Sequence, residues 1–275
     1  MAVTISSKYK PGPPLDQFVD CFWYWESAPR PHAKERLLPN GEPGIVFNLR
    51  DLPFRIYDAQ NLSRYSSYGS AVFSGAGTEG FVIDTDSEEC VFGIQFRPGG
   101  SFPFSKVPAS EFANRSLPLD DLWRQNTAQM RDRLLSAATV AQKFSVAEAC
   151  LMQQLVRPLE LHPAVRFGLN KFCRAPHLIS VSSLIEETGL SQRHFIDTFR
   201  QQVGLTPKAF SRVRRFQRAL RSVHGTKEVD WVSVALGCGY YDQAHFIHDF
   251  KVFSGFTPSQ YLAKATEHLN HVPLA

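Results

Sequence analysis

Two nearly identical runs of six residues place polar side chains opposite paired phenylalanines. HFIDTF begins at His194, and HFIHDF begins at His245, fifty-one residues later. In each run the two Phe residues stand four apart, so on a helix they share one buried face. The opposite face carries Arg, Gln, His and Lys side chains, which can donate hydrogen bonds to nucleic-acid bases or phosphates. The residues that we expect to face nucleic acid are Gln192, Arg193, His194, Asp197 and Arg200 in the first copy, and Gln243, Ala244, His245, His248 and Lys251 in the second.

Asp197 is the residue least expected on such a face, because phosphates repel a carboxylate. It has two candidate roles there. It can accept a hydrogen bond from cytosine N4 in the major groove, or it can pair with Arg193, four residues before it, and Arg200, three residues after it, and hold their side chains in place. The alternative is a slightly rotated helix that leaves Asp197 in solvent.

Basic charge is concentrated in the same part of the chain. Residues 163 to 275 hold 14 Lys and Arg against 8 Asp and Glu, whereas residues 1 to 162 hold 16 against 18. Six basic residues and no acid lie between Lys208 and Arg221. This run indicates either a solvated helix face or a surface that contacts phosphates, and we expect Arg214 to contact phosphate if it faces DNA.

The residues around each run predict a helix, a short turn and a second helix. Each first helix has a candidate N-cap, each turn has a glycine suited to positive φ, and each second helix has a candidate N-cap. These residues are Ser180, Gly189 and Ser191 in the first copy, and Asp230, Gly239 and Asp242 in the second. We therefore predict two helix-turn-helix units at about 180–203 and 230–254, joined by a basic helix from roughly Pro207 to Val223.

Two stretches identify a family resemblance: SSLIEETGLSQRHFIDTFRQQVGLTPKAFSRVRRFQRAL, and WVSVALGCGYYDQAHFIHDFKVFSGFTPSQYL. Through them residues 163–263 resemble the C-terminal domain of the AraC/XylS transcription regulators. The resemblance implies an all-α domain of seven helices at 161–265, whose two reading helices enter successive major grooves of double-stranded DNA. It also implies a cytoplasmic bacterial regulator, for which RNA polymerase is a further partner left open. Ile185, Asp197 and His248 depart from the usual residues of the family, so the DNA sequence read cannot be taken from a relative.

The N-terminal part has a different texture, and the whole chain is expected to be α+β. β-Branched and aromatic runs between Pro43 and Phe96 predict strands, LDQFVDCF predicts a short helix on the spacing of Leu15, Phe18, Val19 and Phe22, and RPLELHP predicts a boundary. We expect a β-rich effector-sensing domain at 1–110 and a helical segment at 111–160. LLPNGEPGIVFNL, FGIQFRPGGSFPF and LPLDDLW resemble the sensor module of one branch of the family, which implies a cupin-like barrel with helices that bind an effector, form a homodimer, or both.

The effector is expected to be an unknown small molecule. Weak candidates for lining its pocket are Trp23, Trp25, Arg36, Asn48 and Arg97, although such Trp residues are more often core and such Arg residues more often solvated. An N-terminal module that senses a protein is an alternative.

An enzyme in the N-terminal part is the other alternative, and the residues speak against it. The only histidines in residues 1–162 are His32 and His162, which are too few for the ligand set of a metal-dependent cupin. GAGTEG at Gly75–Gly80 precedes a strand rather than a helix, so we read it as a hairpin turn instead of a dinucleotide site. We expect no cofactor and no metal.

Localisation is expected to be cytoplasmic. Five cysteines are scattered without a CxxC pair, which is typical of reduced thiols. There is no apolar run of eighteen residues and no apolar segment of a secretory signal, so we expect no contact with a membrane.

Overall fold

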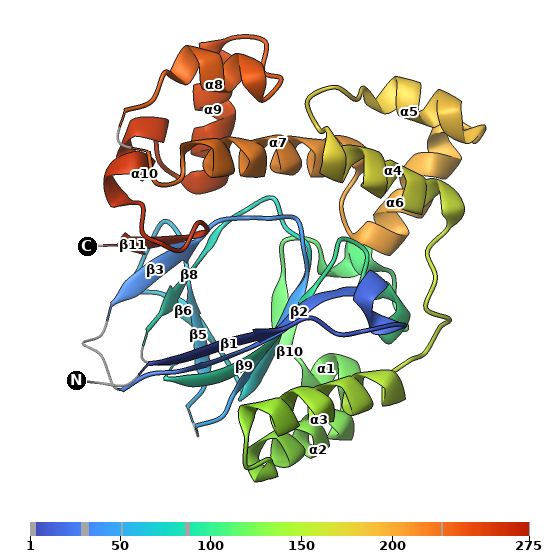
Figure 1. Ribbon diagram of the computed structural model, residues 1–275, viewed down its shortest axis with the longest axis vertical. Coiled ribbons are helices and arrows are strands. Elements are labelled where there is room, and N and C mark those ends of the chain that lie inside the picture. The colour runs from blue at the N-terminus through green and yellow to red at the C-terminus, as the bar shows by residue number, and fades with distance from the viewer. Residues whose placement is uncertain (1–3, 29–32, 51, 86–88, 227, 275) are drawn as a thin grey trace.

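The computed structural model describes residues 4–28, 33–50, 52–85, 89–226 and 228–274, and His32 lies outside them. A β-rich part forms one half of the molecule and a helical part sits on it, as Figure 1 shows. The expected α+β class is confirmed.

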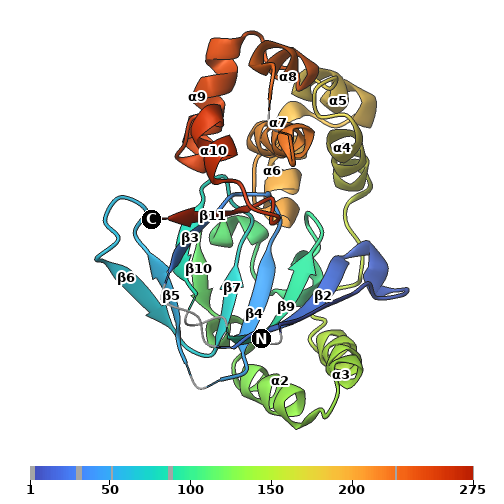
Figure 2. The ribbon, with the colours of Figure 1, turned by 60° about the vertical axis from the view of Figure 1, so that its left-hand side comes forward.

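The β-rich part consists of two antiparallel sheets (Figure 2). The first has the strand order β1 (Ile5–Tyr9), β2 (Val19–Glu26), β9 (Cys90–Phe96), β4 (Gly44–Asn48), β7 (Ala71–Ser74) and β10 (Ser116–Pro118). The second has the order β11 (His271–Leu274), β3 (Lys34–Leu37), β8 (Phe81–Asp84), β5 (Phe54–Tyr57) and β6 (Tyr65–Tyr68). The last strand of the chain is therefore part of a sheet whose other strands come from the N-terminal third.

The helix expected in LDQFVDCF is wrong. Only a 3-10 turn forms there, at Leu15–Gln17, and β2 begins at Val19. The pairing of β2 with β9 shifts register between Val19 and Cys21. Such a bulge reverses the alternation of a strand, so Val19 and Phe22 are both fully buried in the core although they stand three apart. The bulge thus imitates helical spacing.

The glycine-rich run Gly75–Gly80 also differs from its prediction. A strand does follow it, as expected, but β7 and β8 belong to different sheets. The run is therefore a connection between the two sheets and not a hairpin turn.

Three helices cover the first sheet: α1 (Asp120–Trp123), α2 (Gln125–Ser136) and α3 (Val140–Gln153). Leu134 of α2 and Phe144 and Leu151 of α3 are buried in one core with the aromatic residues of the sheet. This helical appendage is thus fixed to the β-rich part through shared apolar burial.

The helical part comprises α4 (Pro163–Arg174), α5 (Val181–Thr188), α6 (Gln192–Val203), α7 (Pro207–Val223), α8 (Trp231–Gly237), α9 (Gln243–Ser254) and α10 (Pro258–Lys264). α7 is the joining helix, with the bounds that the sequence predicts. One core packs α4 to α6 against Phe210 of α7. A second core packs α8 to α10 against Phe216 and Leu220 of the same helix.

The two parts share their cores as well as the chain. Leu38, just after β3, is buried in the core of α7 to α10. Ala76, just after β7, is buried in the core of α4 to α6. Each half of the helical part therefore has a separate apolar contact with the β-rich part.

Candidate nucleic-acid interface

The first helix-turn-helix unit is made by α5 and α6. Gly189 ends α5 with φ 69°, a left-handed conformation that suits glycine. The side chain of Ser191 then accepts a hydrogen bond from the backbone N–H of His194 and caps α6. Phe195 and Phe199 are fully buried. The outward face of α6 is thereby fixed in solvent, and all five residues expected on it are exposed: Gln192, Arg193, His194, Asp197 and Arg200.

Arg193 and Asp197 form an ion pair on this outward face. Arg193 Nε lies 3.8 Å from Asp197 Oδ2, and the Arg193 side chain is 91% exposed. An exposed pair at this spacing stabilises the helix by only about 0.3–0.5 kcal/mol. Its consequence is positional, because the carboxylate limits the orientations of the guanidinium. His194 is placed differently, since its ring centroid lies 6.2 Å from that of His162 at the start of α4.

The second unit repeats the design in α8 and α9. Asp230 caps α8, and Asp242 caps α9 by accepting from the backbone N–H of His245 at 2.7 Å. Phe246 and Phe250 are fully buried. The expected outward residues Gln243, Ala244, His248 and Lys251 are all exposed.

His245 is the exception in the second unit. Its ring packs edge-on against Tyr240 with centroids 5.3 Å apart, and its Nε2 lies 3.8 Å from Asp249 Oδ2. His245 therefore leans toward the interior of the helical part. Tyr241 lies just before α9 and is 87% exposed, and the sequence analysis did not single it out. Two consecutive tyrosines, Tyr240 and Tyr241, stand in this turn. Only Tyr240 is buried in the core, so the second ring lies in solvent.

Most of the basic run in α7 is used inside the protein. Arg212 donates to the buried carboxylate of Asp249 at 2.6 Å. Arg215 and Arg218 donate to the carbonyl oxygens of Gly239 and Gly237, at 2.9 and 3.3 Å. These three guanidinium groups hold α8 and α9 against α7.

Arg214 faces the β-rich part instead of solvent. Its Nη1 donates to Glu42 Oε1 at 3.0 Å, and the two side chains are only 13% and 20% exposed. Burial raises the pKa of the Glu42 carboxyl above its ordinary range, and Arg214 offsets this only in part. In this arrangement Arg214 is engaged in a contact between the two parts.

Both reading helices rest on the β-rich part at their C-terminal ends. A Cβ at Gly204, after α6, would lie 3.2 Å from the carbonyl oxygen of Ala109, and one at Gly255, after α9, would lie 2.1 Å from Arg36 Nη1. Figures 1 and 2 show both helices rising from these ends, so their N-terminal residues lie on the side away from the sheets. N-terminal residues of a reading helix are the ones that contact bases.

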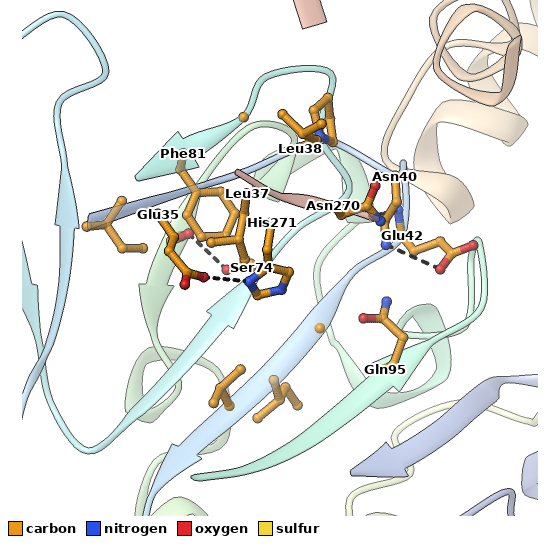
Figure 3. Close-up of a pocket in the computed structure, with 18 of the residues that line it drawn as sticks. Glu35, Leu37, Leu38, Asn40, Glu42, Ser74, Phe81, Gln95, Asn270 and His271 are labelled. Carbon is orange, nitrogen blue, oxygen red and sulfur yellow. Dashed lines mark hydrogen bonds and ion pairs between the residues drawn. The ribbon is translucent and has the colours of Figure 1, made fainter. Parts of the chain in front are cut away.

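The β-rich part contains an open cavity of about 1230 Å³. Trp23 and Trp25 line it, as the sequence suggested. Figure 3 shows a polar chamber of this cavity, where Glu35, Glu42, Gln95, Asn270 and His271 lie around one space. Gln95 uses its Nε2 to donate to the carbonyl oxygen of Pro43, and the carboxylates of Glu35 and Glu42 pair with His271 and Arg214. The side-chain oxygens of Gln95, Glu35 and Glu42 thus give the chamber several acceptors, beside the apolar Leu37, Leu38 and Phe81.

The other three effector candidates have structural contacts outside this cavity. Arg36 donates through Nη1 to the carbonyl oxygen of Ser254 at 3.4 Å. Asn48 is 1% exposed and accepts from the backbone N–H of Arg50. Arg97 donates through Nε to the carbonyl oxygen of Asp16. All three residues therefore occupy paired or buried positions, which is the ordinary outcome for such side chains.

Within the described residues, no group of three or more His, Cys, Asp and Glu side chains is placed to hold a metal ion. None of the described helices is both long and apolar enough to cross a membrane.

Comparison with known proteins gives two family matches. Residues 7–118 match a family described as "Domain of unknown function (DUF6597)", and residues 184–264 match one described as "Helix-turn-helix domain". The chain is 32% identical over 81 residues to an "Uncharacterized HTH-type transcriptional regulator" of Haemophilus influenzae, covering 30% of this chain and 27% of that protein. It is 24% identical over 166 residues to the "Arabinose operon regulatory protein" of Escherichia coli, covering 56% of each. The chain thus spans about a quarter and about half of the lengths of these relatives.

Two solved structures are among those similar to this chain. ToxT from Vibrio cholerae superposes with a TM-score of 0.47 at 12% identity, covering 88% of this chain and 98% of that one. A probable AraC family transcriptional regulator from Rhodopseudomonas palustris gives a TM-score of 0.34 at 28% identity, covering 38% of this chain and 98% of that one.

Proposed function

We propose that the chain is a sequence-specific DNA-binding transcription regulator of the AraC/XylS type, because residues 184–264 match a helix-turn-helix family and the chain is similar to the arabinose operon regulatory protein. α6 and α9 are its reading helices, and one chain reads two successive major grooves. We also propose that it acts in the cytoplasm, where the DNA of a bacterial cell lies.

The observation that supports this proposal best is the common direction of the two reading helices. Each is capped at its N-terminus by a side chain, carries its phenylalanines inward, and ends on the β-rich part. The exposed polar faces therefore stand on the side of the molecule that the sheets leave open. We propose Gln192, Arg193, Asp197 and Arg200 as contacts of the first unit, and Gln243, Ala244, His248 and Lys251 as contacts of the second. His194 and His245 take supporting places at the edges of these faces.

The test is selection of the full-length chain on a library of random duplexes. We expect enrichment of a site with two short conserved blocks about one helical turn apart. The enriched duplex should bind at least a thousand times more tightly than random DNA at the same salt concentration. Binding that is equal for selected and random duplexes would remove the proposal.

The cavity of the β-rich part is proposed as an effector site. Its acceptor-rich chamber is complementary to a small polar molecule that brings hydrogen-bond donors, such as hydroxyl or amino groups. Thermal-shift screening of the full chain tests this, because a ligand that binds only the folded protein raises its unfolding temperature. We expect donor-bearing compounds to stabilise the chain and aliphatic hydrocarbons of the same size to leave it unchanged.

A module that senses a protein is the second candidate function for the β-rich part. The cavity favours a small molecule over a protein as its occupant, since it is bounded by strands on both sides. We propose that no reaction takes place there. Pairing with a second copy through the α2–α3 appendage, and contact with RNA polymerase, are proposals that sedimentation and pull-down experiments test.

A further inference from the structure

The segment after the last helix of the helical part returns to the β-rich part. β11 pairs antiparallel with β3, so that His271 lies opposite Leu37 and Leu274 opposite Lys34. The backbone N–H of Leu38 donates to the carbonyl oxygen of Asn270 at 2.8 Å. The helical part is therefore attached at both of its ends, through residues 154–162 before α4 and through β11 after α10.

β11 and the residues before it are also a wall of the cavity. Asn270 and His271 line the polar chamber (Figure 3), and His271 Nδ1 lies 2.9 Å from Glu35 Oε2. The side-chain oxygen of Asn270 accepts a hydrogen bond from Gln217 Nε2 of α7 at 2.8 Å. A molecule that contacts Asn270 is thus one hydrogen bond away from the helix that joins the two units.

The loop between β3 and β4 likewise lines the cavity on one side and contacts α7 on the other. Leu38, Pro39, Asn40 and Glu42 line the cavity. From its other side Pro39 accepts from Gln217 Nε2 at 2.9 Å, and Glu42 binds Arg214. A Cβ added to Gly41 would lie 3.4 Å from the ring of Phe210. Two separate segments of the cavity wall therefore touch α7.

β3 also supports the second reading helix directly. Arg36 donates to the carbonyl oxygen of Ser254, the last residue of α9, and its guanidinium lies 5.5 Å from the centre of the Phe256 ring. Arg36 lies opposite Val272 of β11, which is fully buried in the core of α7 to α10. β11, β3 and the end of α9 thus form one continuous contact.

We propose that β11 is a clasp through which the occupant of the cavity controls DNA binding. This inference rests on the proposed function. A ligand in the chamber bridges the strands of the β-rich part and the Asn270–His271 end of β11, and so stabilises the docked position of β11. Docked β11 holds α9 on β3 in the orientation in which its outward face is exposed. When only a fraction of the molecules has β11 docked, the apparent affinity for DNA is reduced by that fraction. A ligand that keeps β11 docked removes this reduction and therefore tightens binding of a two-block site.

The test replaces the ligand with a covalent clasp. Lys34→Cys and Leu274→Cys are introduced in the full chain, together with Cys173→Ser, because Cys173 is the exposed one among the free cysteines of the described residues. Directly opposed residues of antiparallel strands lie within the Cα separation that a disulfide needs. We expect the oxidised protein to bind the selected two-block duplex about three- to tenfold more tightly than the reduced protein. A duplex that keeps only the first block should bind both forms equally.

The opposite change is deletion of residues 271–275, which opens the clasp. It should weaken binding of the two-block duplex and leave binding of the first-block duplex unchanged.

The matched control for the disulfide is placed at the other end of the same sheet, with Arg55→Cys and Ser67→Cys across the opposed pair of β5 and β6. This control protein should bind DNA alike in both redox states. Equal two-block affinity of the oxidised and reduced clasp proteins, or weaker binding on oxidation, would overturn the inference. If no form prefers the selected duplex to random DNA, the proposed function itself fails.

Discussion

Asp197 shows how one acid is accommodated on a face that is expected to meet phosphates. Its carboxylate pairs with Arg193 four residues earlier, which agrees with the positioning role among the two that the sequence allowed. An ion pair of this kind lowers the charge that the helix presents to any DNA, and it restricts the Arg193 side chain at the same time.

Asp197→Ala is therefore expected to raise affinity for random DNA and to lower the ratio of selected to random binding. The first effect comes from removal of a negative charge near phosphates, and the second from the greater freedom of Arg193. Fluorescence anisotropy with both duplexes at one fixed salt concentration measures the ratio. Asp132→Ala is the matched control, since it removes an exposed acid from α2 of the appendage. An unchanged ratio in Asp197→Ala would make Asp197 a bystander.

Arg214→Ala should leave the salt dependence of DNA binding unchanged, because the guanidinium is engaged with Glu42. Each phosphate contact contributes about 0.9 to the slope of log affinity against log salt. Arg200→Ala, on the exposed face of α6, should lower that slope by about one contact. Arg214→Ala should instead lower the unfolding temperature, because it leaves a buried carboxylate without its partner. A lower slope with Arg214→Ala would return this residue to the phosphate-contacting set.

Glu42→Gln tests the same contact through pH. Burial raises the pKa of Glu42, so the folded state binds the proton more tightly than the unfolded state does. The stability that this provides is present below the ordinary pKa of about 4.5 and is lost as pH rises through the raised value. Thermal unfolding of the wild type between pH 4.5 and 7 should show this loss, and Glu42→Gln should show less of it. Glu160→Gln, at an exposed site, is the control and should follow the wild type.

At the scale of elements, α7 is the central helix of the helical part, and its Arg side chains bind the neighbouring elements. The Arg212–Asp249 contact joins α7 to α9, and its hydrogen bond raises the pKa of Arg212. Arg215 and Arg218 donate hydrogen bonds to the carbonyl oxygens of Gly239 and Gly237 at the end of α8. The tilt of α9 against α7 is therefore set by charge-assisted hydrogen bonds as well as by the phenylalanine core.

Asp249→Asn should lower the free energy of unfolding by about 1.5–3 kcal/mol, the range for hydrogen bonds to charged groups. It should also weaken binding to the second block of the DNA site, because α9 loses its ion pair with Arg212 of α7. Lys251→Ala is the contrast on the outward face of the same helix, expected to weaken DNA binding with little loss of stability. Chemical denaturation and anisotropy measure the two effects. Equal stability of Asp249→Asn and wild type would show that the core alone holds α9.

Local signals explain why some elements were predictable from the sequence and others were not. Caps such as Ser191 and Asp242 and the paired phenylalanines act within one turn, so α6, α7 and α9 lie where the sequence places them. β11 could not be found this way, because its partner β3 lies at the opposite end of the chain. The same holds for Arg214, whose basic neighbours suggest DNA while its partner Glu42 is 172 residues away.

At the scale of the whole molecule, the β-rich part serves as a platform for both reading helices. Gly204 and Gly255 bring the ends of α6 and α9 against it, and Leu38 and Ala76 enter the two helical cores. The spacing of the reading helices is fixed by α7, whose 17 residues span roughly 25 Å. A rigid spacer of this length does not stretch to follow a displaced DNA block.

The central claim is that one chain reads two blocks at once, and changing the distance between the blocks tests it most directly. Five base pairs are inserted between the two blocks of the selected duplex, which turns the second block to the opposite face of the DNA. The expected result is that affinity falls to that of a duplex with one block alone. An insertion of ten base pairs should not restore it, because α7 cannot span the longer distance. Affinity that stays the same after the five-base-pair insertion would contradict simultaneous reading by α6 and α9.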